Sequence, residues 1–260
     1  MIVWDVDPNI ISLGPFTVRW YGVLFALTFI VGYQIFIWIY RLEKRPEKEI
    51  SELVWYMIIG TVVGARLGHC LFYNPSFYFQ NPFEIIAVWR GGLASHGAAI
   101  GILSALYFYI KKIKNAKYLW VLDRVVITAA LGGFFIRMGN LFNSEIIGLP
   151  TDMPWAFVFA KVDSIPRHPA QLYEALGYLA TFFVLFFIYK KNYKTIKDGL
   201  MFGLFLFLIF GHRFIVEFFK ENQTYFEEGW ILNMGQLLSI PLIITGLYFI
   251  ITRLRSKPQV

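Results

Sequence analysis

The residues from Gly199 to Phe219 read GLMFGLFLFLIFGHRFIVEFF, and this stretch decides the fold. The run that precedes Arg213 contains no charged side chain. About 20 apolar residues suffice for a helix to cross a hydrocarbon core about 30 Å thick. A helix also satisfies every backbone N–H and C=O group within the segment, which lipid cannot do. The stretch therefore predicts a transmembrane helix that carries two charged residues, Arg213 and Glu217, near one end.

Six further apolar runs of similar length occur in the chain of 260 residues. The composition is 57% hydrophobic and 16% charged, whereas an ordinary soluble domain is about 45–50% apolar and about 25% charged. We therefore predict an all-α polytopic membrane protein, with residues 1–260 forming one membrane-embedded domain. The seven expected transmembrane helices cover residues 19–40, 51–73, 92–110, 120–138, 168–189, 199–219 and 235–252.

Three glycines at four-residue spacing lie in the second of these runs. Gly60, Gly64 and Gly68 share one face of the expected helix. A stripe of small residues lets a second helix approach closely. We therefore expect this face to pack against another helix.

Lys and Arg are distributed unevenly over the connections, with 15 on one side of the membrane and 4 on the other, namely Arg90, Lys161, Arg167 and Lys220. Because cytoplasmic loops carry the excess of positive charge, we expect the N-terminus outside and the C-terminus in the cytoplasm. The connection 139–167 is then expected to form a small lobe on the outer face. The net charge of +7 does not indicate nucleic-acid binding, since the basic residues lie between apolar runs. The expected cytoplasmic set is Arg41, Lys44, Arg45, Lys48, Lys111, Lys112, Lys114, Lys117, Lys190, Lys191, Lys194, Lys197, Arg253, Arg255 and Lys257.

Several ionisable residues lie inside the expected helices, where one charge costs roughly 2.5–3.5 kcal/mol at the helix centre. At a rise of about 1.5 Å per residue, five of them fall within about 10 Å of the outer helix ends. These five are Arg66, His96, Glu174, Arg213 and Glu217. Tyr21, Arg137 and Asn140 fall at the outer rim. By contrast, Glu52, Asp123 and Arg124 fall at inner ends, where we expect their side chains to snorkel to water.

Each group has a functional and a structural interpretation. Arg213 and Glu217 share a helix face and could form an ion pair that only neutralises both charges. His96 follows a glycine-rich entry, Arg90-Gly91-Gly92-Leu93-Ala94-Ser95, and could be a hydrogen-bonded packing residue or a base. Ser95 is its neighbour along the helix and would point elsewhere, so a serine hydrolase dyad is not indicated.

A second group of polar residues surrounds the end of the fourth expected helix. The guanidinium of Arg137 presents a fork of donors that suits phosphate, and Asn140 offers both donors and acceptors, so the pair would suit a phospholipid headgroup. The alternative is a helix C-cap at Gly139 or Asn140. Gln171 and Glu174 follow Pro169 at the start of the fifth expected helix and are candidates to face the interior. The sequence contains no metal-binding or nucleotide-binding motif, so neither cofactor has support.

Four patches give the chain a resemblance to the bacterial prolipoprotein diacylglyceryl transferases. The patches are RWYG at 19–22, RGGLASHGAAIG at 90–101, RMGNLFNSEIIG at 137–148, and RHPAQLYE at 167–174 together with RFIVEFF at 213–219. The resemblance extends over essentially the whole chain, and the RxGNxxNxExxG spacing is intact. The family usually has Gly where Ile136 stands and Phe where Leu141 stands.

The resemblance implies transfer of a diacylglyceryl group from phosphatidylglycerol to the thiol of the lipobox cysteine in a prolipoprotein signal peptide. Glycerol phosphate would leave, and neither a metal nor an organic cofactor would be needed. It also implies a multi-pass enzyme of the bacterial cytoplasmic (inner) membrane, with its site facing the outer leaflet. The essential residues of the family correspond to His96, Arg137 and Arg213.

The chemistry of this reaction gives the polar residues roles. Arg137 and Arg213 would hold the leaving phosphate, and His96, with an ordinary pKa of about 6.5, could take the thiol proton. We assign headgroup binding or orientation of the arginines to Tyr21, Arg66, Asn140, Asn143, Glu145, Gln171 and Glu217. The rival interpretation is a transporter or channel for an anion or protons, which would need polar residues from one membrane face to the other.

Overall fold

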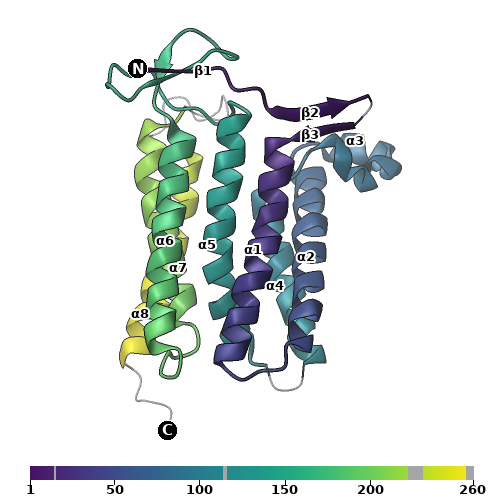
Figure 1. Cartoon of the computed structure of the whole chain (residues 1–260), viewed down its shortest axis with the longest axis vertical. Coiled ribbons are helices and arrows are strands. Elements are labelled where there is room, and N and C mark those ends of the chain that lie inside the picture. Colours follow the sequence, from purple (N-terminus) through teal and green to yellow (C-terminus); the bar gives the residue numbers. More distant parts are fainter. Residues whose placement is uncertain (15, 114–115, 222–230, 256–260) are drawn as a thin grey trace. The chain divides into compact units, whose positions relative to one another are not determined.

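A computed structural model describes residues 1–14, 16–113, 116–221 and 231–255 (Figure 1). Lys114 and Lys257, which the count of basic residues includes, lie outside the described residues. The helices are α1 Trp20–Leu42, α2 Lys48–Phe72, α3 Pro75–Gln80, η1 Pro82–Ile86, η2 Val88–Arg90, α4 Ser95–Lys112, α5 Tyr118–Phe142, α6 Ala170–Asn192, α7 Leu200–Val216, η3 Glu217–Phe219 and α8 Met234–Arg255. The strands are β1 Ile2–Trp4, β2 Asn9–Leu13, β3 Phe16–Arg19, β4 Phe157–Phe159 and β5 Pro166–Arg167.

Within the described residues, 6 helices are long and apolar enough to cross a membrane. They are α1, α2, α5, α6, α7 continued by η3, and α8. The remaining long helix, α4, has 18 residues and begins at Ser95 rather than at residue 92 as expected. Gly91 and Gly92 have φ angles of 84° and 72°, which a right-handed helix cannot include. His96 at one end of α4 and Lys111 and Lys112 at the other leave it less apolar than the six.

The chain divides into two compact units, which we describe separately. The first unit contains Met1–Gly32 and Asp123–Val260, and the second contains Tyr33–Leu122. Helices α1 and α5 each contribute residues to both units.

The second unit is built on close packing of α2 against α4. A Cβ atom on Gly60 would lie 2.6 Å from the Cβ of Ala105, and one on Gly68 would lie 2.7 Å from the Cα of Gly97. Gly64 likewise faces the backbone of Gly97. Contacts this short leave no room for a side chain on these glycines, which confirms that their stripe serves helix packing.

In the first unit, a buried carboxylate joins α5 to the start of α7. Asp123 accepts hydrogen bonds from the backbone N–H groups of Gly199 at 2.7 Å and Phe202 at 2.8 Å. It is fully buried. The expectation that Asp123 reaches out to water is therefore wrong, because the unpaired N–H groups at a helix start offer it partners inside the protein.

A small three-stranded sheet lies at the end of the first unit where α5 ends and α6 begins (Figure 1). Its order is β1-β4-β5, with β1 parallel to β4 and β4 antiparallel to β5. Phe157 and Phe159 of β4 pack with Leu141 of α5 in a hydrophobic cluster that Trp4 also contacts. These strands correct the all-helical expectation. They have at most 3 residues each, too few for a periodic pattern to reveal them.

Candidate active site

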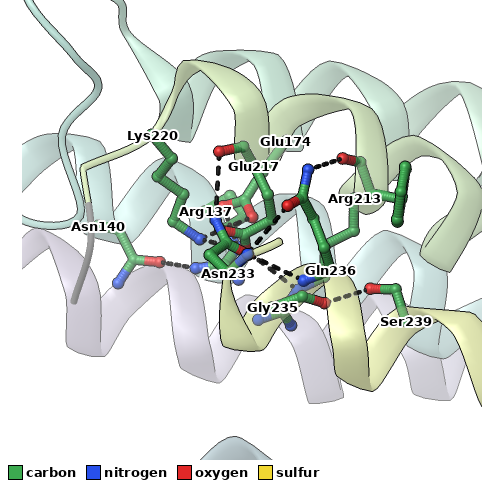
Figure 2. Close-up of polar contacts among 11 residues, drawn as sticks. Arg137, Asn140, Glu174, Arg213, Glu217, Lys220, Asn233, Gly235, Gln236 and Ser239 are labelled. Carbon is green, nitrogen blue, oxygen red and sulfur yellow. Dashed lines mark hydrogen bonds and ion pairs between the residues drawn. The ribbon is translucent and has the colours of Figure 1, made fainter. Parts of the chain in front are cut away.

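Polar side chains from α5, α6, α7, η3 and the start of α8 converge in the first unit (Figure 2). At the centre of this group of side chains is a series of ion pairs in which cations and carboxylates alternate. Arg137 Nε lies 2.9 Å from one carboxylate oxygen of Glu174, and Lys220 Nζ lies 3.4 Å from the other. Lys220 Nζ also lies 2.9 Å from Glu217 Oε1, from which Arg213 Nε is 3.3 Å away. Arg137 and Arg213 therefore belong to one connected network.

Burial varies along this chain of ion pairs. The side chain of Lys220 at its centre is 1% exposed, and those of Glu174 and Glu217 are 2% and 6% exposed. At the ends, the side chains of Arg137 and Arg213 are 14% and 28% exposed. The two arginines are thus the members that a ligand could reach most easily.

The start of α8 closes the network around Glu217. Asn233 donates to Glu217 Oε2 at 3.2 Å. Asn233 and Gln236 also exchange hydrogen bonds, each side chain accepting from the other residue's backbone N–H. This reciprocal pattern is a capping box. A Cβ atom on Gly235 would collide with the Glu217 carboxylate, so glycine is needed where α8 passes this side chain.

Arg137 also connects the ion pairs to a group of amides. Its Nη1 donates to Asn140 Oδ1 at 3.1 Å, and Asn140 Nδ2 donates to Glu145 Oε1 at 2.7 Å. Asn143 Nδ2 donates to the same oxygen at 3.3 Å. Gln171 Nε2 donates to the backbone oxygen of Glu145 at 2.7 Å. This arrangement fixes the carboxamide of Asn140 with its oxygen toward Arg137.

The backbone after α5 is shaped for this arrangement. Helix α5 runs to Phe142, so Asn140 lies within it and the alternative C-cap at Gly139 or Asn140 is wrong. Ser144 and Ile146, on either side of Glu145, have positive φ angles of 54° and 60°. Residues other than glycine rarely adopt this conformation, which is typical of functional segments held by their surroundings.

Tyr21 of α1 lies against the same part of α5. A Cβ atom on Gly139 would be 2.7 Å from Tyr21 Cδ2, so glycine allows the ring to lie flat on the helix backbone. The phenol is close enough to Glu145 and Arg137 for electrostatic interaction. Tyr21 therefore lies near Glu145 and Arg137, two of the other residues predicted for the site.

The segment 139–167, which is expected to form the outer lobe, makes several contacts with the end of η3. Gly148 pairs with Lys220 in an antiparallel bridge, and Leu149 donates to the backbone oxygen of Phe219 at 2.9 Å. Arg167 of β5 forms ion pairs with Asp163, at 2.6 Å, and with Glu221. The guanidinium of Arg167 holds the pKa of the Asp163 carboxyl below its usual value, and a hydrogen bond from the backbone of Ile165 lowers it further. These contacts tie Gly148, Leu149 and Arg167 to residues 219–221 at the end of η3.

Arg66 and His96 belong to the second unit. Arg66 is 4% exposed, and its guanidinium donates to four backbone oxygens that bring the segment between α2 and α4 together. The acceptors are Ile85 at 2.9 Å, Glu84 and Gly91 at 2.5 Å each, and Gly92 at 3.2 Å. These contacts favour a structural role for Arg66.

His96 is the second residue of α4 and is exposed. Its ring contacts those of Phe72, at 5.2 Å between centroids, and Tyr73, at 5.9 Å. Gly97, next to it, is buried against α2. The close packing of α2 against α4 therefore leaves the imidazole exposed at the start of α4.

Sequence reasoning found most of the network but missed three members. Lys220 was counted only as a loop charge, although its ammonium joins the two carboxylates. Asn233 and Gln236 were not considered, although an Asn followed three residues later by Gln is a recognisable helix-start signal. Among the described residues, no group of three or more His, Cys, Asp or Glu side chains could hold a metal ion.

Comparisons with known proteins show the family to which the chain belongs. Residues 8–252 match the family model described as prolipoprotein diacylglyceryl transferase. The phosphatidylglycerol–prolipoprotein diacylglyceryl transferase of Chloroherpeton thalassium is 51% identical, with 96% of this chain and 93% of that protein covered. Those of Tolumonas auensis, 46% identical with both chains fully covered, and Bacteroides fragilis, 44% identical over 95% of this chain and 94% of that protein, are also similar. The chain therefore belongs to the prolipoprotein diacylglyceryl transferase family.

Proposed function

We propose that this protein transfers the diacylglyceryl group of phosphatidylglycerol to the lipobox cysteine of prolipoprotein signal peptides. The sulfur would form a thioether with the glycerol carbon that carries the phosphate ester. The carbon–oxygen bond to phosphate would break, and its electron pair would leave with glycerol phosphate. The thiol proton would pass to a base. The names of the relatives, which contain both substrates, support this reaction.

The observation that carries this proposal is the network joining Arg137 to Arg213. Its ion pairs contain three cations, Arg137, Lys220 and Arg213, but only two carboxylates, Glu174 and Glu217. The ion pairs alone therefore leave one formal positive charge over, and a third carboxylate, that of Glu145, is joined to Arg137 only through Asn140. A phosphodiester carries one negative charge, and charge-assisted contacts from a guanidinium fork suit its oxygens.

The same contacts would assist the reaction itself. Negative charge grows on the leaving phosphate as the carbon–oxygen bond breaks, and fixed donors stabilise such charge without reorganising. Tyr21, Asn140, Asn143, Glu145 and Gln171 would bind the headgroup or orient Arg137, and Glu217 would orient Arg213.

We assign the activation of the thiol to His96. A free thiol has a pKa of about 8.5, so a base must remove its proton near neutral pH. The neutral imidazole can accept a proton in this range. The exposure of His96 at the start of α4 supports access by a peptide substrate.

The orientation in the membrane rests on the basic residues. An excess of 15 over 4 assigns the N-terminus to the outside and the C-terminus to the cytoplasm. Opposite sides for the termini require an odd number of crossings, so α4 would be the seventh span in addition to the 6 apolar helices. Its 18 residues give a length of about 27 Å, close to the core thickness of about 30 Å. The site would then face the outer leaflet of the bacterial cytoplasmic membrane, with the 139–167 lobe outside.

The direct test is to incubate the purified protein with labelled phosphatidylglycerol and a synthetic lipobox peptide. We expect a thioether-linked diacylglyceryl peptide and stoichiometric glycerol phosphate. A peptide with serine in place of the lipobox cysteine is the matched control and should remain unmodified. Movement of anions or protons across proteoliposomes without peptide modification would instead favour the transporter interpretation, which has no support in the comparisons.

A further inference from the structure

We propose that Lys220 is a positioning residue that holds Arg137 and Arg213 in the arrangement the reaction needs. The inference rests on the proposed function. Lys220 does not need to touch substrate for this role, because it acts through the carboxylates of Glu174 and Glu217.

The contacts of Lys220 place it at the midpoint between the two arginines. Its Nζ lies 2.9 Å from Glu217 and 3.4 Å from Glu174, and each of these carboxylates contacts one arginine. These four partners come from four elements, since Arg137 belongs to α5, Glu174 to α6, Arg213 to α7 and Glu217 to η3. One ammonium group therefore connects helices that approach the site independently (Figure 2).

Burial makes this connection necessary. The side chains of Lys220, Glu174 and Glu217 are at most 6% exposed, so water cannot screen the two carboxylates from each other. Without the ammonium, like charges would face each other in a region of low dielectric constant and would repel. Each carboxylate would move away and would carry its arginine with it.

The backbone of Lys220 has a separate task, which makes the side chain testable. Lys220 pairs with Gly148 in the antiparallel bridge that fastens the lobe, and the backbone at Lys220 is extended. A side-chain substitution leaves this bridge in place. Changes in activity can therefore be assigned to the ammonium group and not to loss of the lobe.

The experiment compares Lys220→Met, Lys220→Arg and the control Lys161→Met, which changes an exposed lysine of the same unit. Initial rates are measured over a range of phosphatidylglycerol concentrations with the lipobox peptide. We expect Lys220→Met to lower kcat about 100-fold, as a misplacement of roughly 1 Å can do, with a much smaller change in KM. Lys220→Arg should recover most of kcat, and Lys161→Met should resemble the wild type.

A double variant separates positioning from a general loss of stability. Lys220→Met with Glu217→Gln removes the ammonium and one of the two facing carboxylates, while the uncharged carboxamide introduced by Glu217→Gln keeps the size of the side chain next to Arg213. We expect this double variant to be about tenfold more active than Lys220→Met alone, whereas two independent losses would multiply. Thermal denaturation in detergent would show whether each protein is folded. If Lys220→Met does not fold, the double variant should fold and remain active.

Three results would overturn the inference. Lys220→Met could match Lys161→Met in kcat, the double variant could show multiplied losses, or Lys220→Arg could fail to recover activity in a folded protein. A wild-type protein that forms no thioether product would refute the proposed function, and the inference would fall with it. A failure of the inference and a failure of the proposed function are distinguishable, because only failure of the proposed function leaves the wild-type protein without product.

Discussion

Arg66 and Arg137 are both nearly buried arginines close to a helix end, but their partners differ. Arg66 gives its N–H groups to the backbone oxygens of residues 84, 85, 91 and 92. Arg137 contacts a carboxylate, Glu174, and a carboxamide, Asn140, which themselves have further partners. Arg66 therefore holds together the segment between α2 and α4 in its own unit, whereas Arg137 is one end of a connected electrostatic network.

This difference separates a structural charge from a site charge better than depth does. The expected position near one membrane surface placed Arg66 and Arg213 in the same group. The contacts divide them, because backbone oxygens hold the guanidinium of Arg66 from several sides. Arg213 is 28% exposed and contacts one carboxylate in the ion-pair network, which leaves room for a ligand. The predictions below test this division.

The largest expected effect follows from replacing the site arginines with lysine. Arg137→Lys and Arg213→Lys keep the charge but lose the planar fork of donors. We expect kcat to fall by about 100- to 1,000-fold for each, the usual cost of one donor to a charged transition state. The transfer assay measures this, with the exposed Arg41→Lys as control. Near-normal turnover in both variants would make Arg137 and Arg213 structural residues, like Arg66.

The next effect concerns His96, which shares a unit with Arg66 but is assigned to chemistry. His96→Gln removes the base and keeps hydrogen bonding, so we expect transfer at pH 7 to fall about 100-fold. The deficit should shrink as the pH rises toward the thiol pKa of about 8.5, because solvent then supplies the thiolate. The matched control is His69→Gln, whose ring stacks on the same Tyr73 ring as His96. An equal loss at pH 7 and pH 9 together with lost lipid binding would assign His96 a structural or headgroup role.

A stability effect is expected for Arg66 itself. Arg66→Leu leaves four backbone oxygens without their donor, so we expect the free energy of unfolding to fall by about 2–3 kcal/mol. Thermal denaturation in detergent and limited proteolysis near residues 84–92 would report the loss. Arg90→Ala is the control, since its exposed ion pair with Glu84 contributes little. Unchanged stability with a large rise in KM for phosphatidylglycerol would instead assign Arg66 to headgroup binding, as the sequence predicts.

The smallest effect concerns a third arginine, Arg167 in the lobe. Its guanidinium lowers the pKa of Asp163 from the ordinary value of 3.8. The folded protein therefore binds the proton less readily than the unfolded chain, and the stabilisation present above pH 3.8 is lost as the pH falls through the folded-state pKa. We expect the lobe to loosen slightly as the pH falls below 3.8 and through the lower pKa of the folded protein. Hydrogen exchange of β4 and β5 measures this, and Asp163→Asn should lack the dependence.

The hydropathy of the sequence predicted the long helices because lipid imposes a local condition. Each apolar run must satisfy its own backbone, so its length and composition suffice to identify it. The start of α4 was placed three residues too early, since two glycines with positive φ delay the helix. The stripe of Gly60, Gly64 and Gly68 was also readable, because four-residue spacing places residues on one helix face.

Contacts between distant segments could not be read in the same way. The ion pair of Arg213 with Glu217 was predictable because four residues separate them on one helix face. Lys220 and Glu174 are 46 residues apart, and nothing in their local sequences specifies the contact. The parallel pairing of β1 with β4, and the capping of α7 by Asp123, depend likewise on segments brought together from far apart.

By itself the sequence determined a membrane protein with polar groups near the ends of its helices. The length of an apolar run and the spacing of its glycines are local properties of the chain, and the excess of Lys and Arg is a sum over the connections, so none of them requires knowledge of tertiary contacts. It also indicated arginines whose side chains would suit a phosphate, which remains a prediction. Only the tertiary structure decided how those residues are used. In the tertiary structure, Arg66 donates its hydrogen bonds to backbone oxygens, and a buried lysine connects Arg137 to Arg213. The carboxylate of Asp123 caps α7. The physical reason is that a buried charge must find partners in space, and their identity depends on which helices pack together and at what distance.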